Sequence, residues 1–161
     1  MGTLRWLQAG ATVAVAAAST GMVLLGAGVA RAAEPVQLKS RVGGWCLDGR
    51  NGHNGAATIQ PCDGSRPQQW VFNPVGQIQN VFYAADCLSV RDPADGAPVL
   101  MQLCREVPQD HQRWSSQPDG QVSNAAGFCL NVSADAAKPG APVTAYRCAP
   151  DVAAQQWDPI S

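Results

Sequence analysis

The chain has 161 residues, 14% of which are charged, and its formal net charge is −1 at pH 7. Residues 33–161 contain nine basic and twelve acidic residues, which gives this part of the chain a net charge of −3. Nucleic-acid binding requires a basic face, so a nucleic-acid partner is not expected, and these 129 residues are the size of one ordinary domain.

The first 32 residues predict a secretory signal peptide. Residues 6–30 are uncharged after Arg5, and Ala30-Arg31-Ala32 has the small-x-small pattern of a cleavage site. An uncleaved membrane anchor is the alternative, because about 20 apolar residues suffice to span a bilayer. The Ala-, Gly-, Ser- and Thr-rich composition and the cleavage pattern favour export with removal, which leaves a secreted chain without membrane association. The Ala-rich, Lys-poor composition, with Lys39 and Lys138 the only lysines, indicates a high-GC bacterium.

One tripeptide occurs three times: Gln68-Gln69-Trp70, Gln112-Arg113-Trp114 and Gln155-Gln156-Trp157, at intervals of 44 and 43 residues. A period of this size indicates a repeat architecture. We place one domain at residues 33–161, with repeats at about 36–76, 77–120 and 121–161. Each repeat also contains a Cys-Leu dipeptide, a Gly-Ala pair and a second Cys: Cys46-Leu47, Gly55-Ala56 and Cys62; Cys87-Leu88, Gly96-Ala97 and Cys104; Cys129-Leu130, Gly140-Ala141 and Cys148.

The repeats predict short β-strands, because no window after residue 32 has helical periodicity. Turn formers separate the strands at residues 51–55, 92–96 and 138–140. We therefore expect an all-β domain, with strands at 36–38, 45–47, 57–60 and 70–72 in the first repeat, at 78–83, 86–90, 99–103 and Trp114 in the second, and at 122–124, 128–132, 143–146 and Trp157 in the third.

Three copies of about four strands can close into a barrel with pseudo-three-fold symmetry, which removes the free sheet edges. The Gln two residues before each Trp is expected to bond backbone groups of its loop, since a polar side chain beside a core aromatic needs partners. The expected core is Trp70, Trp114, Trp157, Leu47, Leu88, Leu130, Ile78 and Val122.

Six cysteines in an exported chain indicate disulfides. Three-fold symmetry leaves three of the fifteen possible connectivities: partners within a repeat, one repeat apart or two repeats apart. Pairing within a repeat closes the shortest loops, each contributing roughly 3 kcal/mol. We predict Cys46–Cys62, Cys87–Cys104 and Cys129–Cys148. No metal or other cofactor is expected, because there is no Cys-x-x-Cys pair and the two histidines, His53 and His111, occupy non-equivalent positions.

A six-Cys chain whose repeats each hold Cys-Leu, Gly, Cys and Gln-x-Trp resembles the ricin B-chain-type β-trefoil lectins and the related bacterial carbohydrate-binding modules. The resemblance covers roughly residues 36–157. It implies a β-trefoil of three pseudo-symmetric repeats with intra-repeat disulfides. It also implies a set of sugar contacts in each active repeat: an Asp two residues after the first Cys, an aromatic two before the second Cys, a Gln four before it, and Asn-Gln at the start of the Gln-x-Trp motif.

The first repeat retains Asp48 and Gln68, but Pro67 replaces the Asn. Its segment from Gly55 to Cys62 is one residue shorter than in the other repeats, so two registers stay open. Counting back from Cys62 places Gln60 and Thr58 at the aromatic and Gln positions, whereas counting forward from Gly55 places Pro61 and Ile59 there. His53 and Asn54 in the neighbouring turn could add a polar contact, although such turn residues are more often only solvated.

The second repeat has Ser89 at the Asp position, Gln102 at the aromatic position and His111 before Gln112, so this site is expected to be inactive. The third repeat has Tyr146 for ring stacking, and Thr144 near it, but Asn131 replaces the Asp and Ala154 the Asn. Tyr146 is alternatively a half-buried strand residue. The carbohydrate-binding residues that the resemblance implies are Asp48, Gln68, Asn131, Thr144, Tyr146 and Gln155.

We therefore expect a monomeric, secreted carbohydrate-binding module that binds a glycan or polysaccharide weakly through few sites. The alternative is an exported scaffold that has lost its sugar sites and binds or inhibits a secreted protein. An enzyme is not expected, because paired cysteines leave no nucleophilic thiol and glycoside hydrolysis needs two facing carboxylates. Asp48 and Asp63 could fill that role, but Asp63 is more simply a residue of an Asp-Gly turn.

Overall fold

The computed structural model describes residues 33–133 and 136–161, and the expected signal peptide at residues 1–32 lies outside these ranges. The described residues form short β-strands, turns and single turns of 3-10 helix, as the sequence predicts for an all-β domain. Within these ranges, no helix is long and apolar enough to cross a membrane.

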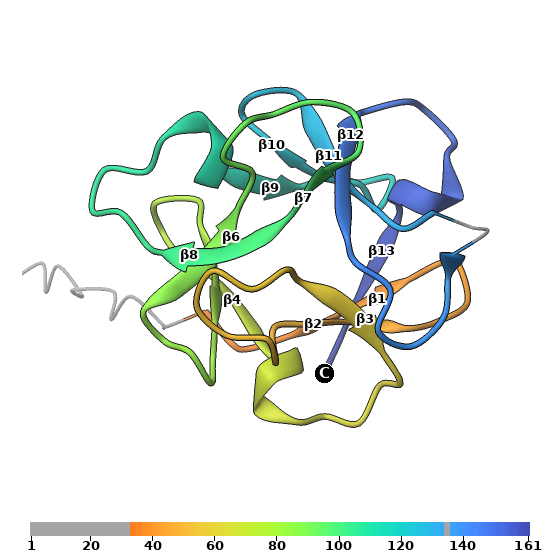
Figure 1. Ribbon diagram of the computed structural model, residues 1–161, viewed down its shortest axis with the longest axis horizontal. Coiled ribbons are helices and arrows are strands. Elements are labelled where there is room, and N and C mark those ends of the chain that lie inside the picture. Colours follow the sequence, from red (N-terminus) through yellow and green to blue (C-terminus); the bar gives the residue numbers. More distant parts are fainter. Residues whose placement is uncertain (1–32, 134–135) are drawn as a thin grey trace, which may run out of the picture. The chain divides into compact units, whose positions relative to one another are not determined.

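The strands follow the same order in each repeat, and the repeats lie around a common centre (Figure 1). A turn of 3-10 helix precedes each Trp strand: η1 (Arg66–Gln68), η2 (Asp110–Gln112) and η4 (Ala153–Gln155). The first repeat contains β1 (Gln37–Ser40), β2 (Cys46–Asp48), β3 (Thr58–Gln60) and β4 (Trp70–Phe72). The second contains β5 (Ile78–Asn80), β6 (Asp86–Ser89), β7 (Ala97–Pro98), β8 (Leu100–Leu103) and β9 (Trp114–Ser116). The third contains β10 (Val122–Asn124), β11 (Phe128–Asn131), β12 (Thr144–Arg147) and β13 (Trp157–Ile160).

Each repeat passes its last strand to the sheet of the next repeat. The three sheets have the strand orders β13-β1-β2-β3, β4-β5-β6-β8 and β9-β10-β11-β12-β7, so every Trp strand pairs with the first strand of the repeat that follows. Strand β13 closes this ring by pairing antiparallel with β1 over four residue pairs, from Gln37 opposite Ile160 to Ser40 opposite Trp157. No repeat can therefore complete its sheet alone.

A triangle of backbone hydrogen bonds joins the three repeats at Ala57, Val99 and Val143. The Ala57 N–H donates to Val99 (2.8 Å), the Val99 N–H to Val143 (3.1 Å) and the Val143 N–H to Ala57 (2.8 Å). All three residues are buried and stand five positions before the second Cys of their repeats. This equivalence settles the register of the first repeat. Counting back from Cys62 is correct, and Gln60 is the counterpart of Gln102 and Tyr146.

The predicted core residues are all buried, and the three tryptophans belong to one hydrophobic cluster. Each indole N–H donates to the carbonyl of the Leu in the Cys-Leu dipeptide of its repeat: Trp70 to Leu47 (3.1 Å), Trp114 to Leu88 (2.9 Å) and Trp157 to Leu130 (3.1 Å). Burial of these large indoles therefore leaves no ring N–H without a hydrogen-bond partner. The predicted disulfides Cys46–Cys62, Cys87–Cys104 and Cys129–Cys148 are also confirmed.

The Gln of each Gln-x-Trp motif holds the loop at the second Cys by two hydrogen bonds, a pair that we call the Gln clasp. Its amide nitrogen donates to the carbonyl before that Cys, and its amide oxygen accepts the N–H of the residue after it, as predicted. Gln68 bonds Pro61 (2.8 Å) and Asp63 (3.0 Å), Gln112 bonds Leu103 (2.9 Å) and Arg105 (3.2 Å), and Gln155 bonds Arg147 (3.0 Å) and Ala149 (2.9 Å).

A second set of glutamines, which the sequence analysis did not single out, supports these clasps. Gln37, Gln77 and Gln121 each donate to the amide oxygen of one clasp, at 2.8, 3.2 and 3.2 Å. The Gly-Gln pairs that precede Ile78 and Val122 are the signal that could have revealed two of them.

One predicted strand is too long. The sequence favours a strand over residues 78–83, but β5 ends at Asn80. The side-chain oxygen of Asn80 accepts the N–H groups of Phe82 and Tyr83, both at 3.0 Å. This Asx turn takes the backbone donors that a continued strand would need, so it overrides the strand preference of Val81, Phe82 and Tyr83.

Candidate sugar-binding surfaces of the three repeats

The structure brings Asn131, Thr144 and Tyr146 of the third repeat together on one face of β11 and β12. Asn131 and Thr144 are directly opposite each other, and the Asn131 amide donates to the Thr144 hydroxyl at 3.4 Å. Tyr146 stands two residues further along β12, on the same face, because side chains alternate in a strand. Asn131 is 8% exposed and Tyr146 40% exposed. The exposed ring of Tyr146 thus lies beside Thr144 on the same strand and diagonally across from Asn131.

The loop before β7 of the second repeat borders this surface. The Asp95 carboxylate accepts the N–H of Arg147 at 2.8 Å, which ties the loop to β12. A Cβ atom at Gly96 would stand 3.4 Å from the Tyr146 hydroxyl, and Gly96 has a φ of +85°. Glycine therefore permits the left-handed turn of this loop, and a Cβ at this position would only touch the ring.

Asp48 of the first repeat does not face solvent. Its side chain is completely buried, and the Arg50 guanidinium lies against it with distances of 2.9 and 2.6 Å from Nε and Nη2 to the two carboxylate oxygens. The Arg50 N–H and the Gln68 amide add bonds of 2.7 and 3.1 Å. Hydrogen bonding to Asp48 raises the pKa of Arg50, which stays charged. A sugar hydroxyl could reach Asp48 only if Arg50 moved away.

Gln68 and Gln155 are buried beneath their loops, and their amides are occupied by the bonds that form the clasps. In the described structure both side chains are buried and bond to backbone groups of these loops. Gln68 additionally positions Asp48 through the 3.1 Å bond from its amide nitrogen.

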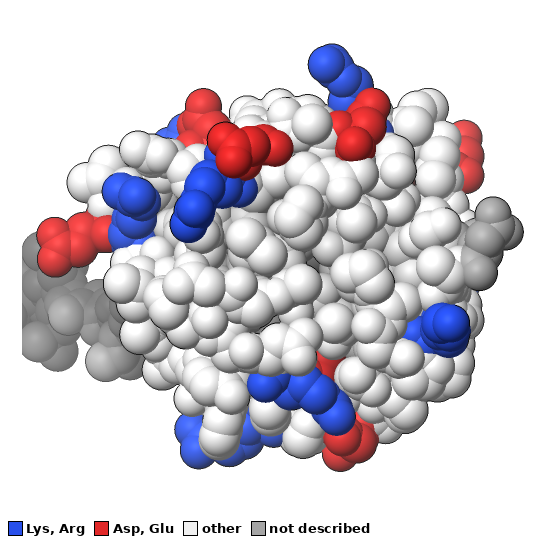
Figure 2. Space-filling view, viewed as in Figure 1, with Lys and Arg blue, Asp and Glu red and all other residues white. Residues whose placement is uncertain are grey.

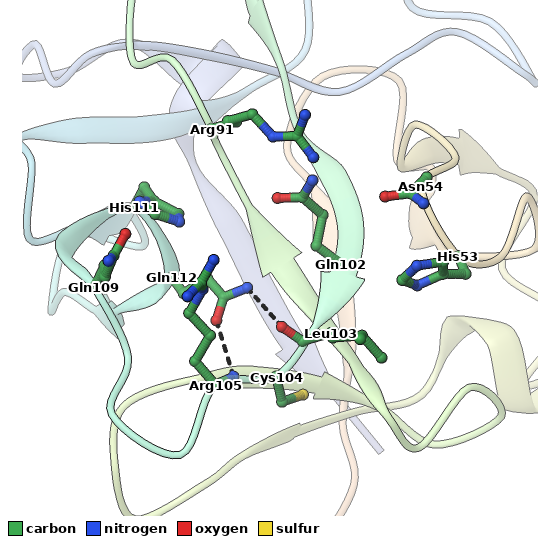
Figure 3. Close-up of a pocket in the computed structure, with 10 residues that line it drawn as sticks. All are labelled: His53, Asn54, Arg91, Gln102, Leu103, Cys104, Arg105, Gln109, His111 and Gln112. Carbon is green, nitrogen blue, oxygen red and sulfur yellow. Dashed lines mark hydrogen bonds between the residues drawn. The ribbon is translucent and has the colours of Figure 1, made fainter.

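The second repeat carries a depression of about 720 Å³. In Figure 3, His111 and Gln109 lie on one side of it and His53 and Asn54 on the other, with Arg91 and Gln102 between them. Ser89, at the family's Asp position, is fully buried, does not line the depression, and its hydroxyl has no partner among the described residues. The lining residues are His53, Asn54, Arg91, Gln102, Leu103, Cys104, Arg105, Gln109, His111 and Gln112.

His53 and Asn54 are more than solvated turn residues, because the first repeat contributes both to the depression of the second. His53 Nδ1 stands 2.7 Å from a carboxylate oxygen of Asp86, which is buried. The Asn54 N–H donates to the carbonyl of Met101 at 2.7 Å. Sequence periodicity does not reveal these contacts, since they join different repeats.

The carboxylates considered for glycoside hydrolysis have structural partners. Asp63 accepts the N–H of Ser65 at 2.9 Å, and hydrogen bonding to Ser65 lowers its pKa, as suits a residue fixed in a turn. Asp48 is held by Arg50. Within residues 33–133 and 136–161, no three His, Cys, Asp or Glu side chains are grouped so that they could hold a metal ion.

Three strand-exchanging repeats, each with a disulfide, a Trp-to-Leu bond and a Gln clasp, define a β-trefoil of the lectin type. The family model of the ricin-type beta-trefoil lectin domain matches residues 34–157, and the chain belongs to this family. An uncharacterized protein of Mycobacterium tuberculosis is 34% identical over 140 residues, which cover 86% of this chain and 85% of that protein.

Solved structures show the same fold. The designed three-fold symmetric protein ThreeFoil is 23% identical, with a TM-score of 0.67 and coverage of 79% of this chain and 98% of its own. The C-half of the earthworm R-type lectin, solved in complex with GalNAc, is 12% identical, with a TM-score of 0.67 and the same coverages. At these identities the likeness extends to the fold alone.

Proposed function

We propose that this protein is a secreted, monomeric carbohydrate-binding module whose main contact surface is the Asn131, Thr144 and Tyr146 cluster of the third repeat. The observation that carries the proposal is the exposure of the Tyr146 ring beside a polar cross-strand pair. The apolar face of a pyranose stacks on such a ring, while an amide and a hydroxyl bond the sugar hydroxyls. Three disulfides support export to an oxidising compartment.

Binding at this surface is expected to be weak. Asn131 can accept and donate, but it lacks the charge that strengthens hydrogen bonds to sugar hydroxyls. In the first repeat Arg50 already occupies the carboxylate of Asp48. Retention then depends on polymeric or clustered glycans that engage the protein several times. GalNAc, the ligand of the earthworm lectin, and galactose are reasonable first monosaccharides to test.

The test is retention of the purified, disulfide-bonded protein on a glycan array and on immobilised polysaccharides. Tyr146→Ala should weaken binding by about tenfold, whereas Tyr146→Phe should retain most of it, because stacking needs the ring. Phe82→Ala is the matched control, since Phe82 is also an exposed aromatic, 51% accessible, but lies in another repeat. Absence of binding to every glycan, or equal binding by Tyr146→Ala, would contradict the proposal.

A protein-binding scaffold is the second candidate. Leu103, the last residue of β8, is 58% exposed, and Val107, in the segment that follows β8, is 83% exposed. Exposed apolar side chains of this kind are suited to a protein contact. A pull-down from the native secretome separates the candidates. A glycan-mediated partner elutes with free sugar, and a partner held by Leu103 and Val107 is lost in Leu103→Ser/Val107→Ser.

A further inference from the structure

The depression of the second repeat has a chemical character opposite to that of the family's sugar site. The family pattern places a carboxylate and an aromatic ring there, but this repeat has the buried Ser89 and the polar Gln102 instead. The lining contains no Asp or Glu and includes two arginines, Arg91 and Arg105, and two histidines. The site has therefore exchanged an anionic acceptor for cationic donors.

Arg91 and Arg105 are available for a ligand. Within residues 33–133 and 136–161, neither guanidinium has a hydrogen bond or an ion pair. By contrast, Arg41, Arg50 and Arg113 are each paired with a carboxylate, at 2.8, 2.6 and 3.2 Å. Arg66 donates to the Val81 carbonyl, and the Arg147 guanidinium lies over the Phe128 ring. Two unpaired guanidiniums at one depression are notable in a domain with a net charge of −3. On the face in Figure 2, basic and acidic side chains are interspersed around an uncharged centre.

Hydrogen bonds and a disulfide hold the backbone at Arg105. The Arg105 N–H donates to Gln112 at 3.2 Å, and the Arg105 carbonyl accepts from Gln77 at 3.0 Å, directly after the disulfide-bonded Cys104. Arg105 thus extends from a rigid loop. Gln102, Gln109 and Asn54 add amide groups around the depression, which suit hydroxyl groups of a ligand.

We propose that this depression binds a saccharide that carries an anionic group, either a uronate carboxylate or a sulfate ester, and that this group bonds to the guanidinium of Arg91 or of Arg105. A guanidinium fork matches both oxyanions and forms charge-assisted hydrogen bonds to them. A volume of about 720 Å³ is sufficient for one or two sugar rings. The inference rests on the proposed glycan-binding function and assigns a ligand class to a second, independent site.

The experiment compares matched oligosaccharides by calorimetry with the purified protein. The carboxylate arm uses a galacturonate tetramer and its methyl ester, and the sulfate arm uses a sulfated galactan oligomer and its desulfated form. We expect one anionic probe to bind at least about tenfold more tightly than its neutral counterpart, and this preference to fall as ionic strength rises. The arm that binds identifies the source of the charge.

Three variants locate the site. Arg91→Gln/Arg105→Gln should abolish the preference for the anionic probe. Arg113→Gln removes the same charge next to η2 but from a guanidinium already paired with Asp110, so the preference should persist. Phe82→Ala should leave it unchanged, because Phe82 does not line the depression.

The outcomes separate the two proposals. Binding of neutral glycans that depends on Tyr146, without preference for either anionic probe, overturns the anionic site and leaves the proposed function standing. A preference for the anionic probe that persists in Arg91→Gln/Arg105→Gln also overturns the anionic site, because the anionic group is then bound elsewhere on the protein. Failure to bind any glycan, neutral or anionic, overturns both.

Discussion

The Gln of each Gln-x-Trp motif shows why this position needs one particular side chain. It must donate to one backbone carbonyl and accept from one N–H on either side of a disulfide-bonded Cys, and the carboxamide of Gln supplies both groups. Glu at neutral pH could only accept, and Asn is one carbon shorter. The same geometry recurs at Gln68, Gln112 and Gln155, so the motif has the same structural role in all three repeats.

Replacing these glutamines should destabilise the fold in a defined order. Gln112→Ala removes the partner of the Leu103 carbonyl and of the Arg105 N–H, whose bonds to Gln112 are partly buried, and we expect this to cost about 1–3 kcal/mol. Gln68→Ala should cost more, because Gln68 also donates to the buried Asp48 carboxylate. Urea unfolding monitored by tryptophan fluorescence measures both.

Gln69→Ala is the matched control, since Gln69 is less buried and its side chain donates only to Gly64 at 3.0 Å. It should change the unfolding midpoint little. Equal midpoints for all three variants would show that the clasps do not hold the disulfide loops.

Individual site residues differ in how well their surroundings could be foreseen. Asn131, Thr144 and Tyr146 were named from the family pattern, which counts positions from the cysteines, and the structure brings them together on β11 and β12. The cover over Asp48 was missed, because Arg50 lies in the turn after β2, where strand alternation no longer sets the direction of a side chain. The depression of the second repeat could not be predicted, because His53 and Asn54 reach it from another repeat.

The strands predicted best are those that contain a Cys-Leu dipeptide or begin at a Trp, where buried residues mark the strand. Strand β7 was missed, because Ala97-Pro98 is too short for an alternating pattern and Pro disfavours a strand interior. The pairing of β1 with β13 follows from closure of the three-fold ring, but the side-chain bond beside it, from Arg41 to Asp158, joins residues 117 positions apart. Local sequence carries no information about such a contact.

The junction of β1 and β13 should make stability depend on pH. Hydrogen bonding to Arg41 lowers the pKa of Asp158 from its ordinary value of 3.8, and Nη2 stands 2.8 Å from the carboxylate. A depressed carboxyl pKa stabilises the fold above the unfolded-state value, and this contribution is lost as pH falls through the folded-state pKa. Arg41→Gln should therefore be slightly less stable than the parent protein at pH 7, and the gap should narrow in acid.

Thermal unfolding of both proteins between neutral pH and pH 2 checks this expectation. Because the pair is exposed, the shift in Tm should be small and should shrink at high salt. Arg66→Gln serves as the comparison, since Arg66 donates to the carbonyl of Val81 and not to a carboxylate. A gap that is constant with pH for Arg41→Gln would remove the ion pair as its cause.

The whole domain combines a symmetric interior with asymmetric surfaces. Each repeat contains the indole bond and the Gln clasp and contributes one residue to the triangle of Ala57, Val99 and Val143. This symmetry arises because each repeat must fit the same neighbours. No such requirement acts on the outer face. There the equivalent positions carry Gln60, Gln102 and Tyr146, opposite the first Cys of each repeat. The fold can therefore be predicted from the repeat pattern, whereas function must be sought at the positions where the repeats differ.

This architecture predicts that the domain tolerates circular permutation between repeats and not within them. Gln37 pairs with Ile160, so a short Gly-rich linker can join residue 161 to residue 33. New ends in the exposed turn at Val75 should leave every sheet intact, and the permutant should form the same three disulfides with a similar Tm. New ends between Ala57 and Thr58 break the triangle of hydrogen bonds and should abolish cooperative unfolding. Disulfide mapping and calorimetry decide, and folding of both permutants would mean that the repeats do not depend on the triangle that joins them.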